Sequence, residues 1–383
     1  MVMRIGKAAA FLAKLAVTAG LGWWVVSGVS WHDYVVDRDG RHLRAWDQRD
    51  GQVLVALPGR EAAWHPAAEF RAAGGAAEFR DAGGQVVHPG MSRVLGRIRP
   101  AFFIFAAVII AGQLTLMGVR WWYLMRRESL GVGLWTTIRL MYVGHFFNFF
   151  LPGATGGDVV RAYLVTRRTT ARTVAVATVL LDRFVGLAGM AALAGVMALA
   201  TWRSEQTHRA AGAIAAILAV ILVTGLVLFS RRIGRLVGLE RLIAHLPKAE
   251  NFRLAIATLQ HLPRCPRDAA VVGAMTLGVH LLLAGGIACL GLALELPTGI
   301  ALYFLFVPVI YILAAIPVSI GGLGLVEGMY VLFFAGGPGA DSSALLALAL
   351  LARLTPMLLS LPGLVFWLGE KGPKARAGSG ETA

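Results

Sequence analysis

Charged side chains are scarce in this sequence, and cysteines are scarcer still. Only 15% of the 383 residues are charged, against about 25% in ordinary soluble domains. The two cysteines, Cys265 and Cys289, are too few for a disulfide framework. The nine histidines lack the spacing of metal ligands. These shortages exclude a disulfide-stabilised secreted domain, and we expect no metal and no cofactor.

Apolar residues are correspondingly abundant in the sequence, and they are gathered in long runs. They make up 57% of the chain, and a helix that crosses a bilayer needs roughly 20 of them in succession. The runs are approximately residues 8–29, 100–124, 134–151, 173–200, 210–229, 269–293, 299–317, 324–335 and 344–368. The sequence therefore predicts an all-α polytopic membrane protein with about seven or eight transmembrane helices.

The net charge of +15 has a different meaning in such a chain than in a soluble one. No nucleic-acid recognition motif accompanies it, so we expect no nucleic acid partner. Basic residues gather instead in alternate loops, around Arg126, Arg168 and Lys371, and in the amphipathic stretch 231–267. By the positive-inside rule both termini face the cytoplasm, and the basic stretches contact anionic lipids of the inner leaflet of the cytoplasmic membrane.

Residues 30–97 differ from the rest because their acidic and basic residues nearly cancel. Short alternating stretches are separated by turn signals such as Asp50-Gly51, and 52–57 has the pattern of a strand. We expect a small β-rich extracytoplasmic domain that offers a surface to a protein partner. The predicted parts of the chain are an N-terminal anchor helix (1–29), this domain (30–97), a transmembrane domain (98–370) and a disordered cytoplasmic tail (371–383).

Two apolar segments are interrupted by the same device, a proline followed after three residues by two glycines. Proline and paired glycines break a helix, and a break at membrane depth survives only where it is buried in protein or lines a wet cavity. Interrupted segments in both halves of a chain are a sequence pointer to a transporter-like binding site. The freed helix N-termini would favour an anionic group such as phosphate. The predicted substrate-binding residues of these segments are Asn148, Pro152, Gly156, Gly157, Asp158 and Arg161 in the first, and Pro317, Gly321, Gly322, Gly324 and Glu327 in the second.

Further ionisable residues lie within apolar runs, where charges are costly and usually face a cavity or a bundle interior. Asp182 and Arg183 are adjacent in one run, and either they belong to the site or they lie near the interface. Arg353 either neutralises Glu327 or meets a lipid phosphate. His145 and His280 have the pattern of packing residues with satisfied nitrogens rather than of ligands.

The two interrupted segments resemble those of the lysylphosphatidylglycerol synthase transmembrane family, which is also described as flippase-like. The matching positions are Asn148, Leu151, Pro152, Gly153, Gly156, Gly157, Asp158 and Arg161, then Pro317, Gly321, Gly322, Gly324 and Glu327. The resemblance covers approximately residues 100–370 and implies movement of lipids or lipid-linked headgroups between leaflets. The aminoacyltransferase domain of two-part members has no counterpart here, so synthase activity is not expected.

The leading hypothesis is a flippase or lipid transporter in which two broken or re-entrant helical segments, related as a pseudo-repeat, line a central cavity. In it Arg161, with Arg353 and glycine N–H groups, holds the phosphate of a phospholipid or lipid-linked substrate. Asp158 and Glu327 contact the rest of the headgroup or take up a proton. The alternatives are an intramembrane enzyme acting on a lipid or polyprenyl phosphate, and an accessory subunit for envelope assembly. No nucleophile–base pair supports the enzyme, so we expect no catalytic residue.

Overall fold

The computed structural model describes residues 16–21, 30–37, 41–57, 60–70, 87–150, 156–229, 265–316, 322–335 and 342–370, with isolated positions between them. Several predictions lie outside these ranges. They are most of the anchor helix, the amphipathic stretch 231–267, the tail 371–383, and the substrate-binding residues Pro152, Pro317 and Gly321.

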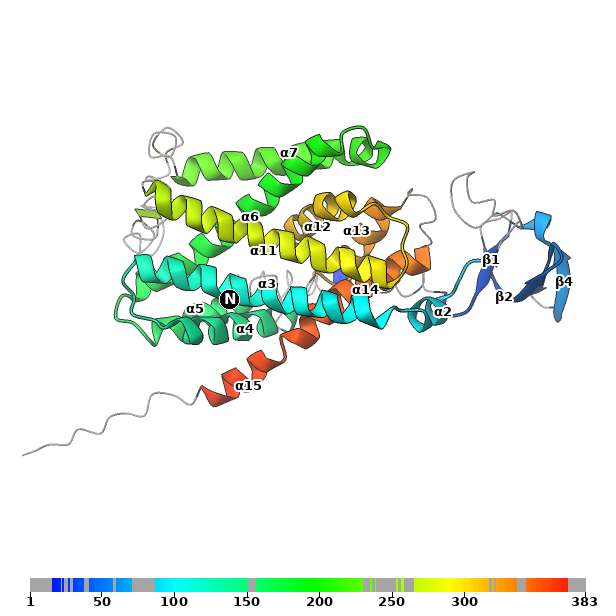
Figure 1. Cartoon of the computed structure of the whole chain (residues 1–383), viewed down its shortest axis with the longest axis horizontal. Helices are drawn as coiled ribbons and strands as arrows, with labels where there is room; N and C mark the ends of the chain where they lie inside the picture. The colour runs from blue at the N-terminus through cyan, green and yellow to red at the C-terminus, as the bar shows by residue number, and fades with distance from the viewer. Residues whose placement is uncertain are drawn as a thin grey trace, which may run out of the picture.

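Helices dominate the described residues and run side by side along the long axis of the molecule (Figure 1). Their bounds are α2 (Met91–Gly96), α3 (Pro100–Arg127), α4 (Leu134–Phe150), α5 (Gly156–Thr166), α6 (Arg172–Ala200), α7 (Glu205–Phe229), α11 (Pro266–Ala293), α12 (Ile300–Ala314), α13 (Leu325–Phe334), α14 (Ser342–Leu359) and α15 (Pro362–Gly369).

Four stretches of the described residues are long and apolar enough to cross a membrane: Pro100–Arg127, Arg172–Ala200, Pro266–Ala293 and Ser343–Gly369. At 1.5 Å per residue, the 28 residues of α3 extend about 42 Å, which exceeds the roughly 30 Å of a bilayer core. Helices α12 and α13 are apolar but shorter. The prediction of a polytopic helical membrane protein is confirmed, whereas the count of seven or eight crossings and the re-entrant path of two segments stay predictions.

Helices α3 and α11 pack against each other along their whole length. At one end Arg99 pairs with Glu295 at 2.6 Å, and at the other Arg127 pairs with Asp268. Between these ends a Cβ at Gly286 would lie 2.7 Å from a side-chain carbon of Ile110, so only glycine permits the approach. This antiparallel pair forms one wall of the helical core.

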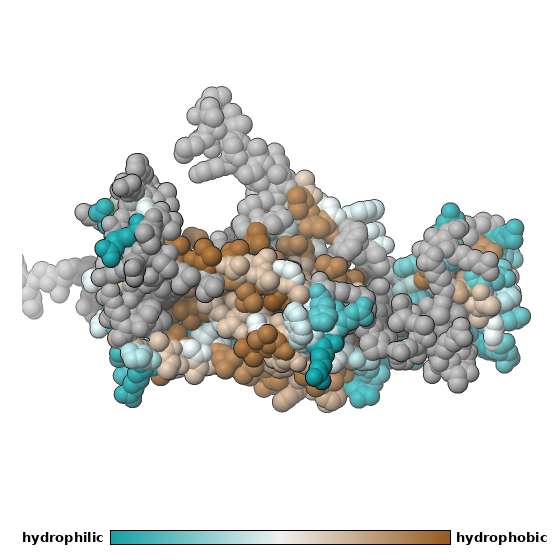
Figure 2. All heavy atoms as spheres, turned by 90° about the horizontal axis from the view of Figure 1, so that it is seen from above, coloured by the Kyte–Doolittle hydropathy of each residue, from teal (hydrophilic) through white to brown (hydrophobic). Residues whose placement is uncertain are grey.

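The surface of the helical part exposes many large apolar side chains, as a surface in contact with lipid does. Leu199, Leu332 and Val108 are among the large apolar side chains that are well exposed. Figure 2 shows hydrophobic residues across the middle of the molecule and hydrophilic ones mainly toward its two ends. Exposed leucine and valine in such a band indicate a surface in contact with acyl chains rather than with water.

The predicted β-rich insert contains a four-stranded antiparallel sheet in the order β1-β2-β3-β4. The strands are β1 (Tyr34–Val36), β2 (His42–Arg49), β3 (Gln52–Ala56) and β4 (Ala62–Pro66). Asp50 and Gly51 both have positive φ, as a two-residue type I′ hairpin loop requires, so the Asp-Gly turn signal was informative. Val35, Val53 and Val55 form a small core on one face of the sheet. The presence of a sheet in this region is therefore confirmed.

Candidate functional site

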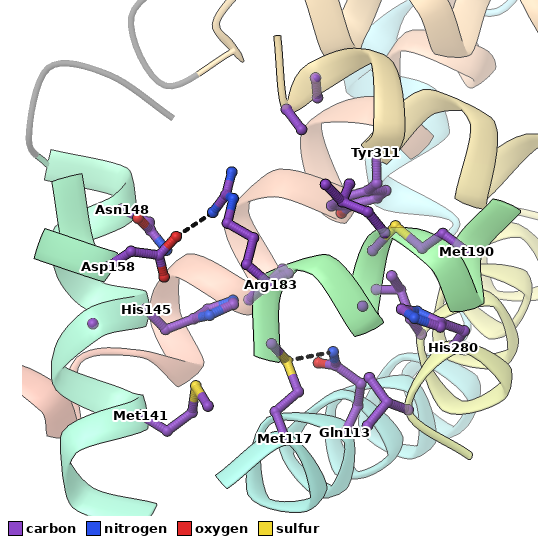
Figure 3. Close-up of a pocket in the computed structure, with 18 of the residues that line it drawn as sticks. Gln113, Met117, Met141, His145, Asn148, Asp158, Arg183, Met190, His280 and Tyr311 are labelled. Carbon is purple, nitrogen blue, oxygen red and sulfur yellow. Dashed lines mark hydrogen bonds and ion pairs between the residues drawn. The ribbon is translucent and has the colours of Figure 1, made fainter. Parts of the chain in front are cut away.

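A cavity of approximately 270 Å³ opens among the helices, and residues from α3, α4, α5, α6, α11, α12, α13 and α14 line it. Figure 3 shows labelled side chains from α3, α4, α5, α6, α11 and α12 converging on it. Both halves of the transmembrane region thus contribute to one space. The earlier interrupted segment supplies Asp158 and Arg161 to this space, and the later one is followed by α13, which supplies Val326.

The first interrupted segment separates α4 from α5, which pack closely together. A Cβ at Gly157 would lie 1.7 Å from the carbonyl oxygen of Gly144, so a larger residue would force the two helices apart. The Gly157 N–H donates to Oδ1 of Asn148 at 2.9 Å. Asn148 on α4 therefore caps the start of α5 from the neighbouring helix. This contact fixes the first turn of α5, which carries Asp158 and Arg161.

Five charged residues form an alternating chain beside this turn. It runs Arg183, Asp158, Arg161, Asp182, Arg120, and each neighbouring pair is an ion pair. Arg161 lies 3.1 Å from each of its two aspartates, and Arg120 lies 2.9 Å from Asp182. We call these five residues the arginine–aspartate chain. It begins and ends on a positive charge.

Arg161, Asp182 and Arg120, at one end of this chain, are removed from solvent, and uncharged neighbours hold them in place. Asp182 and Arg120 are each 1% exposed. Arg120 also donates to the hydroxyl of Thr276 on α11 at 3.2 Å, and the guanidinium of Arg161 lies over the ring of Trp121 at 4.9 Å. Buried charges persist only when they are paired and hydrogen-bonded. The outer member, Arg183, is 28% exposed and lines the cavity.

The second interrupted segment leads into α13. It too combines a capped helix start with a buried ion pair, but it has fewer charged residues. Gly322 and Gly324 have φ of +72° and +76°, a region that L side chains rarely adopt. The Gly324 N–H donates to Oε2 of Glu327 at 2.8 Å, so Glu327 caps its own helix. Glu327 also forms a buried ion pair with Arg353 of α14. We call these two residues the arginine–glutamate pair.

The structure brings most of the described predicted residues to the cavity. Asn148, Asp158, Arg161, Asp182, Arg183 and Arg353 line it. Glu327 reaches it through Arg353, so of the two alternatives for Arg353 the structure has the neutralising one. Gly156 and Gly157 begin α5, and Gly322 and Gly324 precede α13.

Two details differ from the predictions. The N–H groups of Gly157 and Gly324 are bonded to Asn148 and Glu327 and are thus not free to receive phosphate. The neighbours Asp182 and Arg183 point to different partners, and Asp182 is buried among the helices whereas Arg183 is partly exposed. Helical geometry explains this, because consecutive residues lie about 100° apart around the axis.

Sequence reasoning missed two residues of the site. Arg120 stands alone in the apolar run of α3, and that isolation was a signal, because a lone arginine within a membrane segment requires a partner. His280 was predicted to be a packing residue with satisfied nitrogens, and the structure contradicts only the second part of that prediction. The residue is 2% exposed, and neither ring nitrogen forms a well-shaped hydrogen bond to the described residues.

Among the described residues, no group of three or more His, Cys, Asp or Glu is arranged to hold a metal ion. Comparison with known proteins found no match among curated proteins or solved structures. The sequence profile of the lysylphosphatidylglycerol synthase TM region matches residues 90–363. This range includes both interrupted segments and every charged residue of the cavity, and the chain belongs to this membrane protein family.

Proposed function

We propose that the protein binds the phosphate-bearing headgroup of a lipid in this cavity and moves it between the leaflets of the cytoplasmic membrane. The observation that carries the proposal is the arginine–aspartate chain, buried among membrane helices and ending in arginine on both sides. Ionisable residues at such depth are costly and mark substrate pathways. Arginine suits phosphate because its planar fork matches two phosphate oxygens.

The charge balance of the cavity favours an anionic ligand. Among the described residues, four arginines belong to the two clusters, namely Arg120, Arg161, Arg183 and Arg353. Three carboxylates oppose them: Asp158, Asp182 and Glu327. One positive charge is left over. A headgroup with one net negative charge would neutralise it, with Arg183 as its first contact because this arginine is the most exposed of the four.

We infer transport rather than lipid chemistry, because each carboxylate of the cavity is already paired with arginine. The acyl chains would stay in the bilayer while the headgroup passes between helices. We place both termini in the cytoplasm and the sheet outside, following the positive-inside rule. Arg126 and Arg127 end α3, and Arg167 and Arg168 directly follow α5. These ends of α3 and α5 lie away from the sheet (Figure 1). The sheet remains available to an extracytoplasmic partner in this proposal.

Translocation in proteoliposomes tests the proposal. The purified chain is reconstituted with a fluorescent phospholipid of net charge −1, and the fraction accessible to a membrane-impermeant quencher is followed over time. We expect Arg183→Gln to slow translocation about tenfold or more, since one charge-assisted hydrogen bond contributes about 1.5–3 kcal/mol. Arg139→Gln is the matched control. Arg139 is an exposed arginine on α4 that stacks on Trp135 and does not line the cavity.

Two results would refute the transport role. One is a wild-type rate equal to that of protein-free vesicles. The other is an Arg183→Gln rate equal to that of the Arg139→Gln control, which would remove the arginine–aspartate chain from the pathway.

A further inference from the structure

His280 presents two ring nitrogens that nothing in the described structure satisfies well. It lies on α11, is 2% exposed and lines the cavity. Neither Nδ1 nor Nε2 has a hydrogen bond of ordinary geometry to the described residues, although the ring interacts with the backbone of Gly186. Buried polar groups are almost always paired, so an exception that faces a cavity indicates a ligand.

The ring of His280 is held in place by close packing between α6 and α11. A Cβ at Gly189 would lie 2.3 Å from the Thr276 methyl carbon and 3.1 Å from Cδ2 of His280. The absence of a side chain at Gly189 therefore lets the imidazole approach α6, with its Nε2 atom 3.2 Å from the same Cβ position. A ring confined in this way can present its nitrogens only along a fixed direction, as a specific binding group must.

Gln113 of α3 is a second uncharged polar group on the same wall of the cavity. It is buried, and its amide nitrogen donates to the sulfur of Met117 at 3.0 Å, a weak acceptor. Figure 3 shows Gln113 and His280 on one side of the cavity, with Asn148 and Asp158 on the other. We call the side with Asp158 the charged side and the side with Gln113 and His280 the amide–imidazole side, and Arg183 lies between them in this view.

We propose that His280 and Gln113 form a subsite for an uncharged, hydroxyl-bearing part of the lipid headgroup. An uncharged imidazole carries one donor and one acceptor, and an amide carries both kinds, so hydroxyl groups can match them in either tautomer. A cation is poorly served there, because Asp182 is already paired with both Arg120 and Arg161. A phosphate is better served by the arginines on the charged side.

This inference rests on the proposed function and completes its geometry. The phosphate would lie at the arginine–aspartate chain while the rest of the headgroup extends toward α11. Selectivity would then come from the uncharged subsite, because a site built to bond a hydroxyl rejects an analogue that lacks it. Arg183 would attract the phosphate, and His280 would make the site selective among phosphate-bearing lipids.

Two lipids with equal charge and nearly equal size separate these roles. Phosphatidylglycerol carries two headgroup hydroxyls, and phosphatidylpropanol carries none. In the proteoliposome assay we expect the wild-type chain to translocate phosphatidylglycerol about tenfold faster, which corresponds to one net hydrogen bond. His280→Phe and Gln113→Leu should each abolish this preference by lowering the phosphatidylglycerol rate to that of phosphatidylpropanol. His208→Phe, at an exposed histidine outside the cavity, is the matched control and should keep the preference.

The outcomes distinguish the subsite from the transport role itself. Equal wild-type rates for the two lipids would overturn the subsite and leave transport standing, since solvent would then satisfy His280. If His280→Phe and Gln113→Leu lower the translocation rates of both lipids equally, the subsite is also overturned, because the two residues would then have a structural role. Transport of neither lipid by the wild-type chain would refute the proposed function. Inhibition by water-soluble glycerophosphate, at concentrations that leave phosphatidylpropanol transport unchanged, would support the subsite but identify a free headgroup as its ligand.

Discussion

The two interrupted segments carry the same elements but differ in how much charge they bury. Asp158 is the third residue of α5 and Glu327 is the third residue of α13, and each pairs with an arginine from another helix. Around Asp158 the pair grows into a five-residue chain, whereas around Glu327 it stays a pair. A carboxylate in the first turn of a helix is stabilised by the helix dipole. The two interrupted segments therefore supply equivalent carboxylates to the site, and the number of charges around each depends on the neighbouring helices.

The two segments also differ in how the helix start is capped. Asn148 on α4 caps α5 across a helix–helix contact, while Glu327 caps its own helix α13. The first break consequently depends on the packing of α4 against α5. The second depends mainly on local backbone geometry, in which Gly322 and Gly324 have positive φ. Three substitutions test the two clusters and the α4–α5 contact through their effect on stability. We expect the largest loss for Asp182→Asn, a smaller one for Gly157→Ala and the smallest for Glu327→Gln.

Asp182→Asn should produce the largest loss. It removes the only aspartate that pairs with both Arg120 and Arg161 in the described structure, and it leaves two buried guanidinium groups without their shared counter-charge. Breaking a buried pair costs about 3–5 kcal/mol. We expect a strongly lowered Tm in detergent. Glu370→Gln, which breaks the partly exposed pair with Arg168, is the control and should cost about 0–1 kcal/mol. Equal Tm values for the two variants would contradict the burial of the chain.

Gly157→Ala should come next, because its Cβ would collide with the Gly144 carbonyl and separate α4 from α5. Overpacking of this kind costs about 1–3 kcal/mol and can exceed that, and a Cβ placed 1.7 Å from a backbone oxygen should cost at least the upper value. Gly112→Ala is the matched control, since a Cβ there meets nothing within 4 Å. It should be neutral or stabilising by up to about 1 kcal/mol, the helix propensity difference. If thermal unfolding shows both variants to be equally stable, the close α4–α5 contact is wrong.

Glu327→Gln should cost the least of the three, about 1.5–3 kcal/mol, the usual value for a hydrogen bond to a charged group. Gln keeps an oxygen that can still accept the Gly324 N–H, so the variant removes the charge and spares the cap. Only one arginine loses its partner here, against two in Asp182→Asn. A larger Tm loss for Glu327→Gln than for Asp182→Asn would reverse the ranking of the two clusters.

Much of the fold followed from the sequence, because length and apolarity alone identify helices that can cross a membrane. The Asp50-Gly51 turn was visible for a similar reason, since few residues tolerate positive φ. The charged site was foreseen at the two interrupted segments, where Pro and Gly mark broken helices. Arg120 and His280 were missed because their roles depend on contacts between α3, α6 and α11. Partners so far apart in the chain are set by packing, which no local pattern encodes.

The central claim is that a phosphate-bearing lipid occupies the cavity beside Arg183. Native mass spectrometry of the protein released from detergent tests it most directly, because a lipid that stays bound adds its own mass and is identified by fragmentation. The account predicts an adduct of one phosphate-containing lipid on the wild-type chain and on Arg139→Gln, and its loss or strong depletion on Arg183→Gln. Equal occupancy on all three proteins, or no phosphate-containing adduct on the wild-type chain, would contradict it.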